Sequence, residues 1–226
     1  MNTSVLLRRV SNGRTDLVHG LAADVLRHFG PELLGWCAYY GDVTACRVLL
    51  ATGQSLVSLG EDRGLNAAAF HGHWQLCEFL IENGARVDFA DPATGETPLH
   101  SAVTNEDRSR YDLVVQVLLR AGAEPNAATN PGVPTHAFMR DARTRGETPL
   151  HRGALFGTAA TIALLLESGA SRESRDAHGE TPLGWASWAR RPVDVLRALL
   201  YADHRIHPEH QPMRINLLGK PDDGDQ

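Results

Sequence analysis

The sequence predicts an all-α fold in which about six short helix-turn-helix repeats stack side by side into a solenoid. The first observation is an internal repeat, because Gly-Glu-Thr-Pro-Leu-His at residues 95–100 recurs at 146–151 and, without its histidine, at 179–184. The last two copies lie 33 residues apart, a period typical of repeat proteins. The 226-residue chain also has only 6 Phe, 4 Tyr and 4 Trp. Most of its core must therefore consist of aliphatic side chains, as in thin stacked layers.

Each inner helix, the first of a pair, is predicted to begin at the repeated motif. A proline in the first turn of a helix loses no hydrogen bond, and the threonine before it can cap free N–H groups. The second helix should end at Gly84, Gly122 or Gly169, since each follows an aliphatic run and suits a left-handed C-cap. One helix pair has too little apolar surface to fold alone, so the motif leucines should be buried between repeats. The motif residues are Thr97, Pro98, Leu99, His100, Thr148, Pro149, Leu150, His151, Thr181, Pro182 and Leu183.

Further inner helices are marked by a leucine that a glycine follows seven residues later, as in Leu6 with Gly13 and Leu34 with Gly41. We therefore expect six inner helices, starting near residues 6, 34, 65, 99, 150 and 183. The first and last repeats are degenerate, as capping repeats are. The array would form one domain over residues 1–205. Residues 206–226 would form a C-terminal cap or tail, with the last residues disordered.

Two segments, each of which follows the second helix of a predicted repeat, are similar to the repeat motif of a known family. Residues 83–88 read Asn-Gly-Ala-Arg-Val-Asp, and residues 121–126 read Ala-Gly-Ala-Glu-Pro-Asn. Together with the Thr-Pro-Leu-His motif, they make the chain resemble the ankyrin-repeat family over about residues 3–205. The resemblance implies β-hairpin-like turns, called fingers below, that project between the helix pairs. It also implies that His100 and His151 bond the backbone of the neighbouring turn, and that a concave face binds a protein.

Repeat four is longer than the others, since Leu99 and Leu150 lie 51 residues apart. The intervals between glycines place about four extra residues near 104–110 and about fourteen in the fourth finger, at 127–145. This finger contains Phe138 and Met139 beside Arg140, an apolar pair that we expect to be exposed. Long surface loops cost little to close. We therefore expect the insertion to contribute little to the stacked core.

Aromatic and charged side chains supply the candidate partner-binding surface. The resemblance to the ankyrin-repeat family implies that the two residues before each helix-closing glycine, together with the finger turns, face the partner. Aromatic side chains at such positions contribute strongly to the binding energy of protein interfaces. The alternative is that these aromatic side chains only pack between repeats. Arg140, Arg143, Arg145 and Arg152 also form a local basic excess that could steer an acidic partner. The candidate binding residues are Tyr39, Tyr40, Phe70, His71, Phe138, Met139, Arg140, Arg143, Phe156, Arg175, His178 and Trp188.

Composition and motifs argue against several classes of protein. A net charge of −5 gives no basic footprint for nucleic acid, and the longest apolar runs are far too short to cross a membrane. The sequence contains no nucleophile elbow, Walker loop, zinc-protease motif or dinucleotide fingerprint, so we expect no enzymatic activity, cofactor or metal. Arg8 and Arg9 follow an apolar patch, the reverse of a signal peptide. Three cysteines without C-x-x-C spacing suit a reducing cytoplasm.

We therefore predict a monomeric, cytoplasmic, non-enzymatic scaffold that binds another protein through its concave face and enlarged fourth finger. One alternative is a small enzyme or metal-binding protein, because His204, His207 and His210 are spaced by three, although Pro208 prevents one helix from presenting them all. Another alternative is an effector or toxin-neutralising protein of the same fold. The pair His71 and His73 lacks the further ligands that zinc would need.

Overall fold

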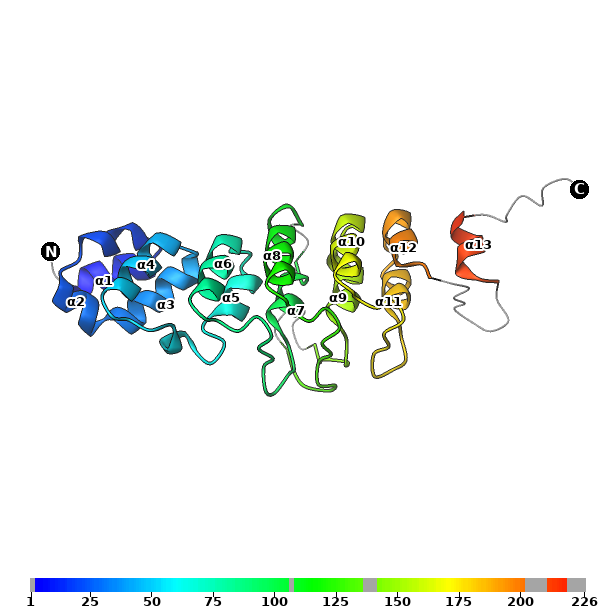
Figure 1. Cartoon of the computed structure of the whole chain (residues 1–226), viewed down its shortest axis with the longest axis horizontal. Coiled ribbons are helices and arrows are strands. Elements are labelled where there is room, and N and C mark those ends of the chain that lie inside the picture. Colours follow the sequence, from blue (N-terminus) through cyan, green and yellow to red (C-terminus); the bar gives the residue numbers. More distant parts are fainter. Residues whose placement is uncertain (1–2, 106–107, 136–141, 202–210, 219–226) are drawn as a thin grey trace, which may run out of the picture.

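The computed structural model describes residues 3–105, 108–135, 142–201 and 211–218. Within these ranges, thirteen α-helices and two 3₁₀ helices follow one another along a single long axis (Figure 1). The described residues contain no β-strand, and one isolated antiparallel bridge joins Pro134 to Arg143. The predicted all-α solenoid is thereby confirmed.

The inner helices form one row along this axis. They are α1 (Thr3–Ser11), α3 (Gly30–Tyr40), α5 (Leu65–Phe70), α7 (Pro98–Ala102), α9 (Pro149–Phe156) and α11 (Pro182–Trp188). Each helix of the row packs against the next. Each also packs against an element of a second, outer row.

The outer row begins with a 3₁₀ helix and continues with α-helices. Its members are η1 (Thr15–Gly20), α4 (Val43–Ala51), α6 (Trp74–Glu82), α8 (Arg108–Arg120), α10 (Ala159–Glu167) and α12 (Val193–Leu199). Short helices α2 (Ala23–His28) and η2 (Leu56–Leu59) lie in connecting segments, and α13 (Met213–Leu218) packs on α12. The Arg197 side chain bonds the Leu217 carbonyl at 3.0 Å, which ties α13 to the last outer helix.

Stacking of aliphatic side chains makes the core. Leu99, Leu118, Leu150 and Leu165 have no exposed surface, and Leu183 has 1%. Burying such side chains is the main favourable term in folding. Because no helix pair encloses its own leucines, the repeats stabilise one another.

The three cysteines belong to this core and are free thiols. Burial raises the pKa of Cys37 and of Cys77 to about 12, and it also raises the pKa of Cys46. A thiol with so high a pKa stays protonated at neutral pH and is a poor nucleophile. These side chains act as small apolar groups.

The motif threonine and histidine explain where the inner helices begin and how they connect. The Thr97 N–H donates to Nδ1 of His100 at 3.2 Å, and Nε2 of His100 lies 3.2 Å from the Glu147 carbonyl in the next repeat. Burial, aided by the charge of Arg152, lowers the pKa of His100 to about 3. The imidazole is therefore neutral, and Nε2 donates to that carbonyl. Nε2 of His151 lies 3.1 Å from the Glu180 carbonyl in the same way.

The fingers are joined by backbone hydrogen bonds. The Asn130 N–H donates to the Thr94 carbonyl at 2.8 Å, and the Ala177 N–H donates to the Arg145 carbonyl at 2.7 Å. Gly95 has a φ of +70°, and a Cβ there would lie 2.9 Å from the Asn130 nitrogen. The motif glycine is therefore required twice, by the left-handed backbone and by the close approach of the next finger.

Candidate binding surface

Large apolar side chains are exposed at the C-terminal ends of three inner helices. Tyr39, Phe70 and Trp188 occupy the same position in α3, α5 and α11. Each lies five residues after the leucine that marks its repeat, which is Leu34, Leu65 or Leu183. Their exposed fractions are 52%, 39% and 80%. We call the surface that they mark the inner-helix surface. Exposed aromatic side chains at equivalent repeat positions are what a binding surface presents.

The first part of this surface is an aromatic cluster on repeats two and three. The Tyr39 ring meets the Tyr40 and His71 rings edge to face, at centroid distances of 5.1 and 4.9 Å. Phe70 meets His71 in the same way, at 5.3 Å. The Tyr40 hydroxyl donates to the Ser11 carbonyl at 3.0 Å, so Tyr40 also links two repeats.

The histidine pair beside this cluster is held by other protein groups. Nε2 of His73 lies 3.0 Å from the Tyr39 carbonyl, and the Arg110 guanidinium lies 2.9 Å from its Nδ1. Burial lowers the pKa of His73, and Arg110 lowers it further. Among the described residues, no group of three or more His, Cys, Asp or Glu side chains could hold a metal ion.

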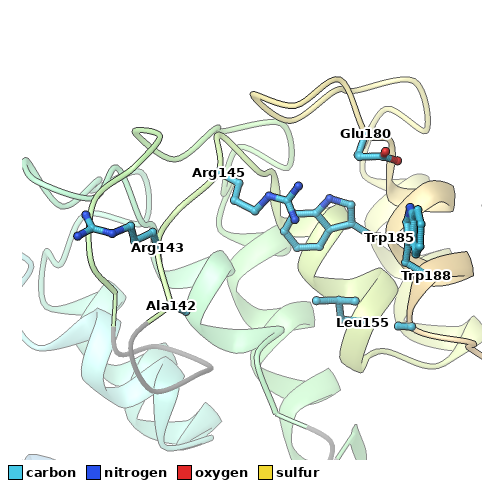
Figure 2. A pocket seen from close by; sticks show the side chains of 8 residues that line it. Ala142, Arg143, Arg145, Leu155, Glu180, Trp185 and Trp188 are labelled. Atoms are coloured by element: carbon cyan, nitrogen blue, oxygen red, sulfur yellow. The ribbon is translucent and has the colours of Figure 1, made fainter.

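The second part is a groove of about 510 Å³ between the fourth finger and helices α9 and α11 (Figure 2). Leu155, Trp185 and Trp188 supply its large apolar side chains, while Arg143, Arg145 and Glu180 supply its charged ones. Figure 2 shows Trp185 between the Arg145 side chain and Trp188. A concave, mostly apolar site with a few charged groups is typical of ligand and peptide sites.

The wall of this groove is fixed by polar contacts. Trp185 is 6% exposed, and its indole N–H donates to the Asp176 carboxylate at 3.0 Å. The Arg145 guanidinium lies 3.2 Å from the same carboxylate and 5.3 Å from the Trp185 ring centroid. The Asp176 side chain has no exposed surface. Burial raises the pKa of Asp176, but the Glu180 and His178 N–H groups, Trp185 and Arg145 lower it overall.

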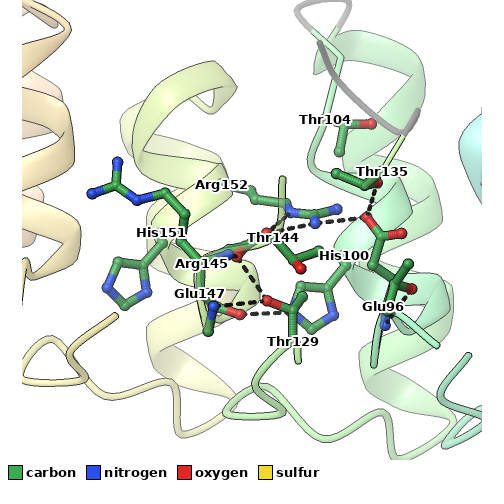
Figure 3. Close-up of polar contacts among 12 residues, drawn as sticks. Glu96, His100, Thr104, Thr129, Thr135, Thr144, Arg145, Glu147, His151 and Arg152 are labelled. Carbon is green, nitrogen blue, oxygen red and sulfur yellow. Dashed lines mark hydrogen bonds and ion pairs between the residues drawn. The ribbon is translucent and has the colours of Figure 1, made fainter. Parts of the chain in front are cut away.

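A buried polar cluster lies behind the groove, where the fourth finger joins the helices (Figure 3). The guanidinium of Arg152 lies 2.6 Å from the Glu147 carboxylate and 2.6 Å from that of Glu96. The Thr129 hydroxyl donates to Glu147 and the Thr135 hydroxyl to Glu96, both at 2.7 Å. One arginine therefore connects the third finger, which lies between α6 and α7, with the fourth finger and α9.

The charge state of Glu147 follows from this cluster. Burial raises its pKa, but Arg152 and hydrogen bonds from the Arg145 N–H and Thr129 outweigh burial and lower the pKa to about 2. Glu147 is therefore ionised at neutral pH although its side chain has no exposed surface. A buried carboxylate is tolerated only when it is paired and hydrogen-bonded in this manner.

Comparison with known proteins decides the family. Residues 34–129 match the family model described as ankyrin repeats (3 copies). The chain belongs to the ankyrin-repeat family. This confirms the resemblance that the Thr-Pro-Leu-His motif indicated. Ankyrin repeats generally act as protein-protein interaction modules.

Several curated ankyrin proteins are similar to parts of the chain. B-cell lymphoma 3 protein homolog of Mus musculus is 33% identical over 133 residues, which cover 59% of this chain and 25% of that protein. Ankyrin repeat and SOCS box protein 3 of Bos taurus is 30% identical over 176 residues, covering 66% and 32%. A putative ankyrin repeat protein of Rickettsia felis is 34% identical over 83 residues, covering 37% and 35%. The chain thus spans about a third or less of the length of these relatives.

The structure brings only some predicted site residues together. Tyr39, Tyr40, Phe70 and His71 form one cluster, whereas Trp188 lies in the groove at the other end of the ankyrin array. The two parts are separated at repeat four, where Thr104 has 8% exposure. Phe156 is half-buried at the end of α9.

The fingers contribute fewer of the predicted residues. Arg175 and His178 are exposed on the finger before α11, and the Arg175 guanidinium bonds the Gly179 carbonyl at 2.7 Å. Arg143 is exposed and bonds the Gly132 carbonyl at 2.7 Å. Phe138, Met139 and Arg140 lie outside the described residues, as do His204, His207 and His210. No helix in the described ranges has the length and hydropathy needed to cross a membrane.

Two expectations about the fourth finger were wrong. Arg152 does not belong to an exposed basic patch, because it is fully buried between Glu96 and Glu147. The insertion also contributes to the packed structure, because Thr129 and Thr135 are 4% and 2% exposed and bind these two carboxylates. Loop-closure arguments consider only chain entropy and so miss such contacts.

Sequence reasoning missed Trp185 as a groove residue, and it placed Arg145 in a basic patch without showing that Arg145 lines a groove with Trp185. Trp185 and Trp188 are three residues apart, a spacing that places them on the same side of one helix turn. That spacing was the available signal for Trp185. The position of Arg145 depends on how the finger folds back, and no local pattern shows it.

Proposed function

We propose that this ankyrin protein is a non-enzymatic, cytoplasmic scaffold that acts as a monomer and binds another protein through its inner-helix surface and fourth finger. The observation that carries the proposal is the exposure of Tyr39, Phe70 and Trp188 at equivalent positions of three repeats. Large apolar side chains that stay in water do not contribute the free energy of burial to folding. Aromatic side chains are the commonest anchors of protein interfaces. The relatives are consistent with this proposal because they are ankyrin-repeat proteins too.

The free, buried cysteines support a reducing compartment. The net charge of −5 supports a protein partner over nucleic acid. The metal-binding alternative depends on His204, His207 and His210, which lie outside the described ranges. No described residue favours the effector alternative over the scaffold.

Site-specific photo-cross-linking tests the proposal. A photoreactive phenylalanine analogue at position 39, 70 or 188 should cross-link to a partner in cells of the source organism, and mass spectrometry identifies that partner. Matched controls carry the analogue at Val193 or Leu113, which are also exposed, at 51% and 39%, but belong to the outer helices α12 and α8. Equal cross-linking from both sets, or from the controls alone, would contradict binding at the inner-helix surface.

A further inference from the structure

We propose that the groove between the fourth finger and helices α9 and α11 binds an acidic-apolar peptide segment of the partner. A large apolar side chain of that segment packs on Trp188, and a neighbouring aspartate or glutamate pairs with Arg145. This inference rests on the proposed function, because it specifies what one part of the inner-helix surface recognises. It also assigns a role to Arg145 and Trp185, which the repeat motif does not explain.

The apolar half of the recognition comes from Trp188. Its side chain is 80% exposed, the largest exposed fraction among the large hydrophobic residues of the described ranges. Leu155, Ala142 and Ala189 lie around it in the same groove. A groove of about 510 Å³ accommodates a short peptide segment with a large side chain.

The charged half comes from the finger wall. Among the side chains that line the groove, Arg143 and Arg145 face the one carboxylate of Glu180, because the Asp176 carboxylate that also pairs with Arg145 is fully buried. This positive excess belongs to a chain whose net charge is −5, so it is a local feature. An acidic segment is electrostatically complementary to it, and a basic one is not.

Arg145 is the arginine placed to bind the carboxylate. Its side chain is 43% exposed and points toward Trp185 in Figure 2, whereas Arg143 lies farther along the same segment. Its contact with Asp176, at 3.2 Å, uses one terminal nitrogen. A guanidinium has five N–H donors, so the exposed part can pair with a second carboxylate beside the indoles.

The groove is also pre-organised for a ligand. Asp176 holds both the Trp185 indole and the Arg145 guanidinium, at 3.0 and 3.2 Å, and is itself fully buried. Thr144 of the same finger is 1% exposed and donates to the Asn130 carbonyl. A rigid wall lowers the ordering cost of binding.

A phage-displayed library of random short peptides, selected on the full chain, tests the inference. The enriched peptides should contain Asp or Glu within two positions of a large apolar residue. A synthetic copy of the best peptide should bind the Trp188→Ala variant at least tenfold more weakly than the parent in calorimetry. Replacing its acidic residue by the amide should weaken binding to the parent several-fold but have no effect with Arg145→Gln. Circular dichroism checks that each variant is folded.

Three results would overturn the inference: no enrichment, enrichment of basic or uncharged apolar peptides, or an affinity that Trp188→Ala leaves unchanged. If Arg145→Gln does not fold, the Arg143→Gln variant and the salt dependence of peptide affinity replace it. A peptide affinity that neither the Arg143→Gln substitution nor salt changes would contradict the charged half of the recognition. Peptides whose binding depends on Tyr39 and Phe70, and not on Trp188, would overturn the groove assignment. They would leave the proposed function standing, because they would still bind the inner-helix surface.

Discussion

Arg152 and Glu147 form an ion pair at 2.6 Å in which neither side chain has exposed surface. The same guanidinium reaches Glu96 of the preceding finger at 2.6 Å. These residues lie at the junction of two ankyrin repeats, and Thr129 of the insertion bonds Glu147 there. The buried pair therefore holds the enlarged finger against the helices and positions the wall of the groove.

Replacing Arg152 by alanine should destabilise the protein strongly. The change leaves the Glu147 carboxylate buried without its cation, and breaking a buried pair in this way costs about 3–5 kcal/mol. Urea unfolding followed by circular dichroism measures the loss. Glu147→Gln in the same background should recover part of it, because the amide carries no charge.

A matched control for this experiment is Arg86→Ala. Arg86 pairs with Asp88 at 3.2 Å, but both side chains are more than 60% exposed, at 67% and 62%. Exposed pairs contribute little, so the urea midpoint should stay at the parent value. An Arg152→Ala protein as stable as Arg86→Ala would contradict the structural role of the buried pair.

Stability should fall in acid through Glu147. Its folded-state pKa of about 2 lies below the ordinary value of 4.5, so its contribution is present above pH 4.5 and is lost as the pH falls toward 2. By linkage this contribution is on the order of 3 kcal/mol. Unfolding free energies measured from pH 6 to pH 2 should therefore decline less steeply below pH 4.5 in Glu147→Gln than in the parent. Parallel curves would mean that Glu147 is not the group responsible.

Buried His100 adds a second pH range, at higher pH, in which the stability of the fold changes with pH. Its folded-state pKa of about 3 lies below its ordinary value of 6.5, so neutral His100 favours the folded state above pH 6.5. This contribution is lost as the pH falls from 6.5 toward 3. Both proteins keep His100, so this decline is common to both, and the difference expected below pH 4.5 comes from Glu147.

Leu150→Ala should cost about 2–5 kcal/mol, since it opens a cavity at a site with no exposed surface between stacked repeats. Thermal or urea unfolding measures this loss. Val57→Ala removes apolar atoms from a side chain that is 66% exposed and should leave the midpoint nearly unchanged. If the two variants unfold together, the repeats are not stacked through Leu150.

Two shortened versions of the fourth finger should distinguish the structural role of its base from the role of its tip. The Thr135 N–H donates to the Ala142 carbonyl at 2.9 Å, so an Asn-Gly turn can replace residues 136–141 between them. This variant should melt like the parent, whereas deletion of residues 129–143 should lower the melting temperature because it removes Thr129 and Thr135. If Phe138, Met139 and Arg140 contact the partner, the short-turn variant should bind at least tenfold more weakly. Equal affinity would restrict binding to the helices and the groove.

Local sequence patterns predict the helices well because the responsible interactions are local. Thr97 and Pro98 start α7 through contacts within one turn, and a motif seen three times makes such a start recognisable. The contacts of Arg152 are different, since Glu96 is separated from it by 56 residues. Only the folding of the third and fourth fingers onto each other brings the two together. The same holds for Arg145, whose partner Asp176 lies in the next finger.

The candidate surface was predicted in composition but not in arrangement. The position two residues before the helix-closing glycine, with its equivalent in repeat six, holds Tyr39, Phe70 and Trp188, which are exposed. It did not show that the equivalent residue of repeat four, Thr104, is buried. The exposure of Thr104 depends on its folded surroundings, including its hydrogen bond to the Ser101 carbonyl at the end of α7. Side-chain packing across repeats is therefore the part that sequence periodicity leaves undetermined.

The central claim is that the inner-helix surface binds a protein partner, and a calorimetric affinity measurement tests it most directly. The partner identified by cross-linking is titrated into the full chain, into a Tyr39→Ala, Phe70→Ala, Trp188→Ala variant, and into a Leu113→Ala, Val193→Ala, Leu218→Ala control. All six side chains are exposed, so both variants should fold. We predict at least a hundredfold loss of affinity for the first variant and less than a threefold change for the control. Equal affinities for the two variants would contradict the claim.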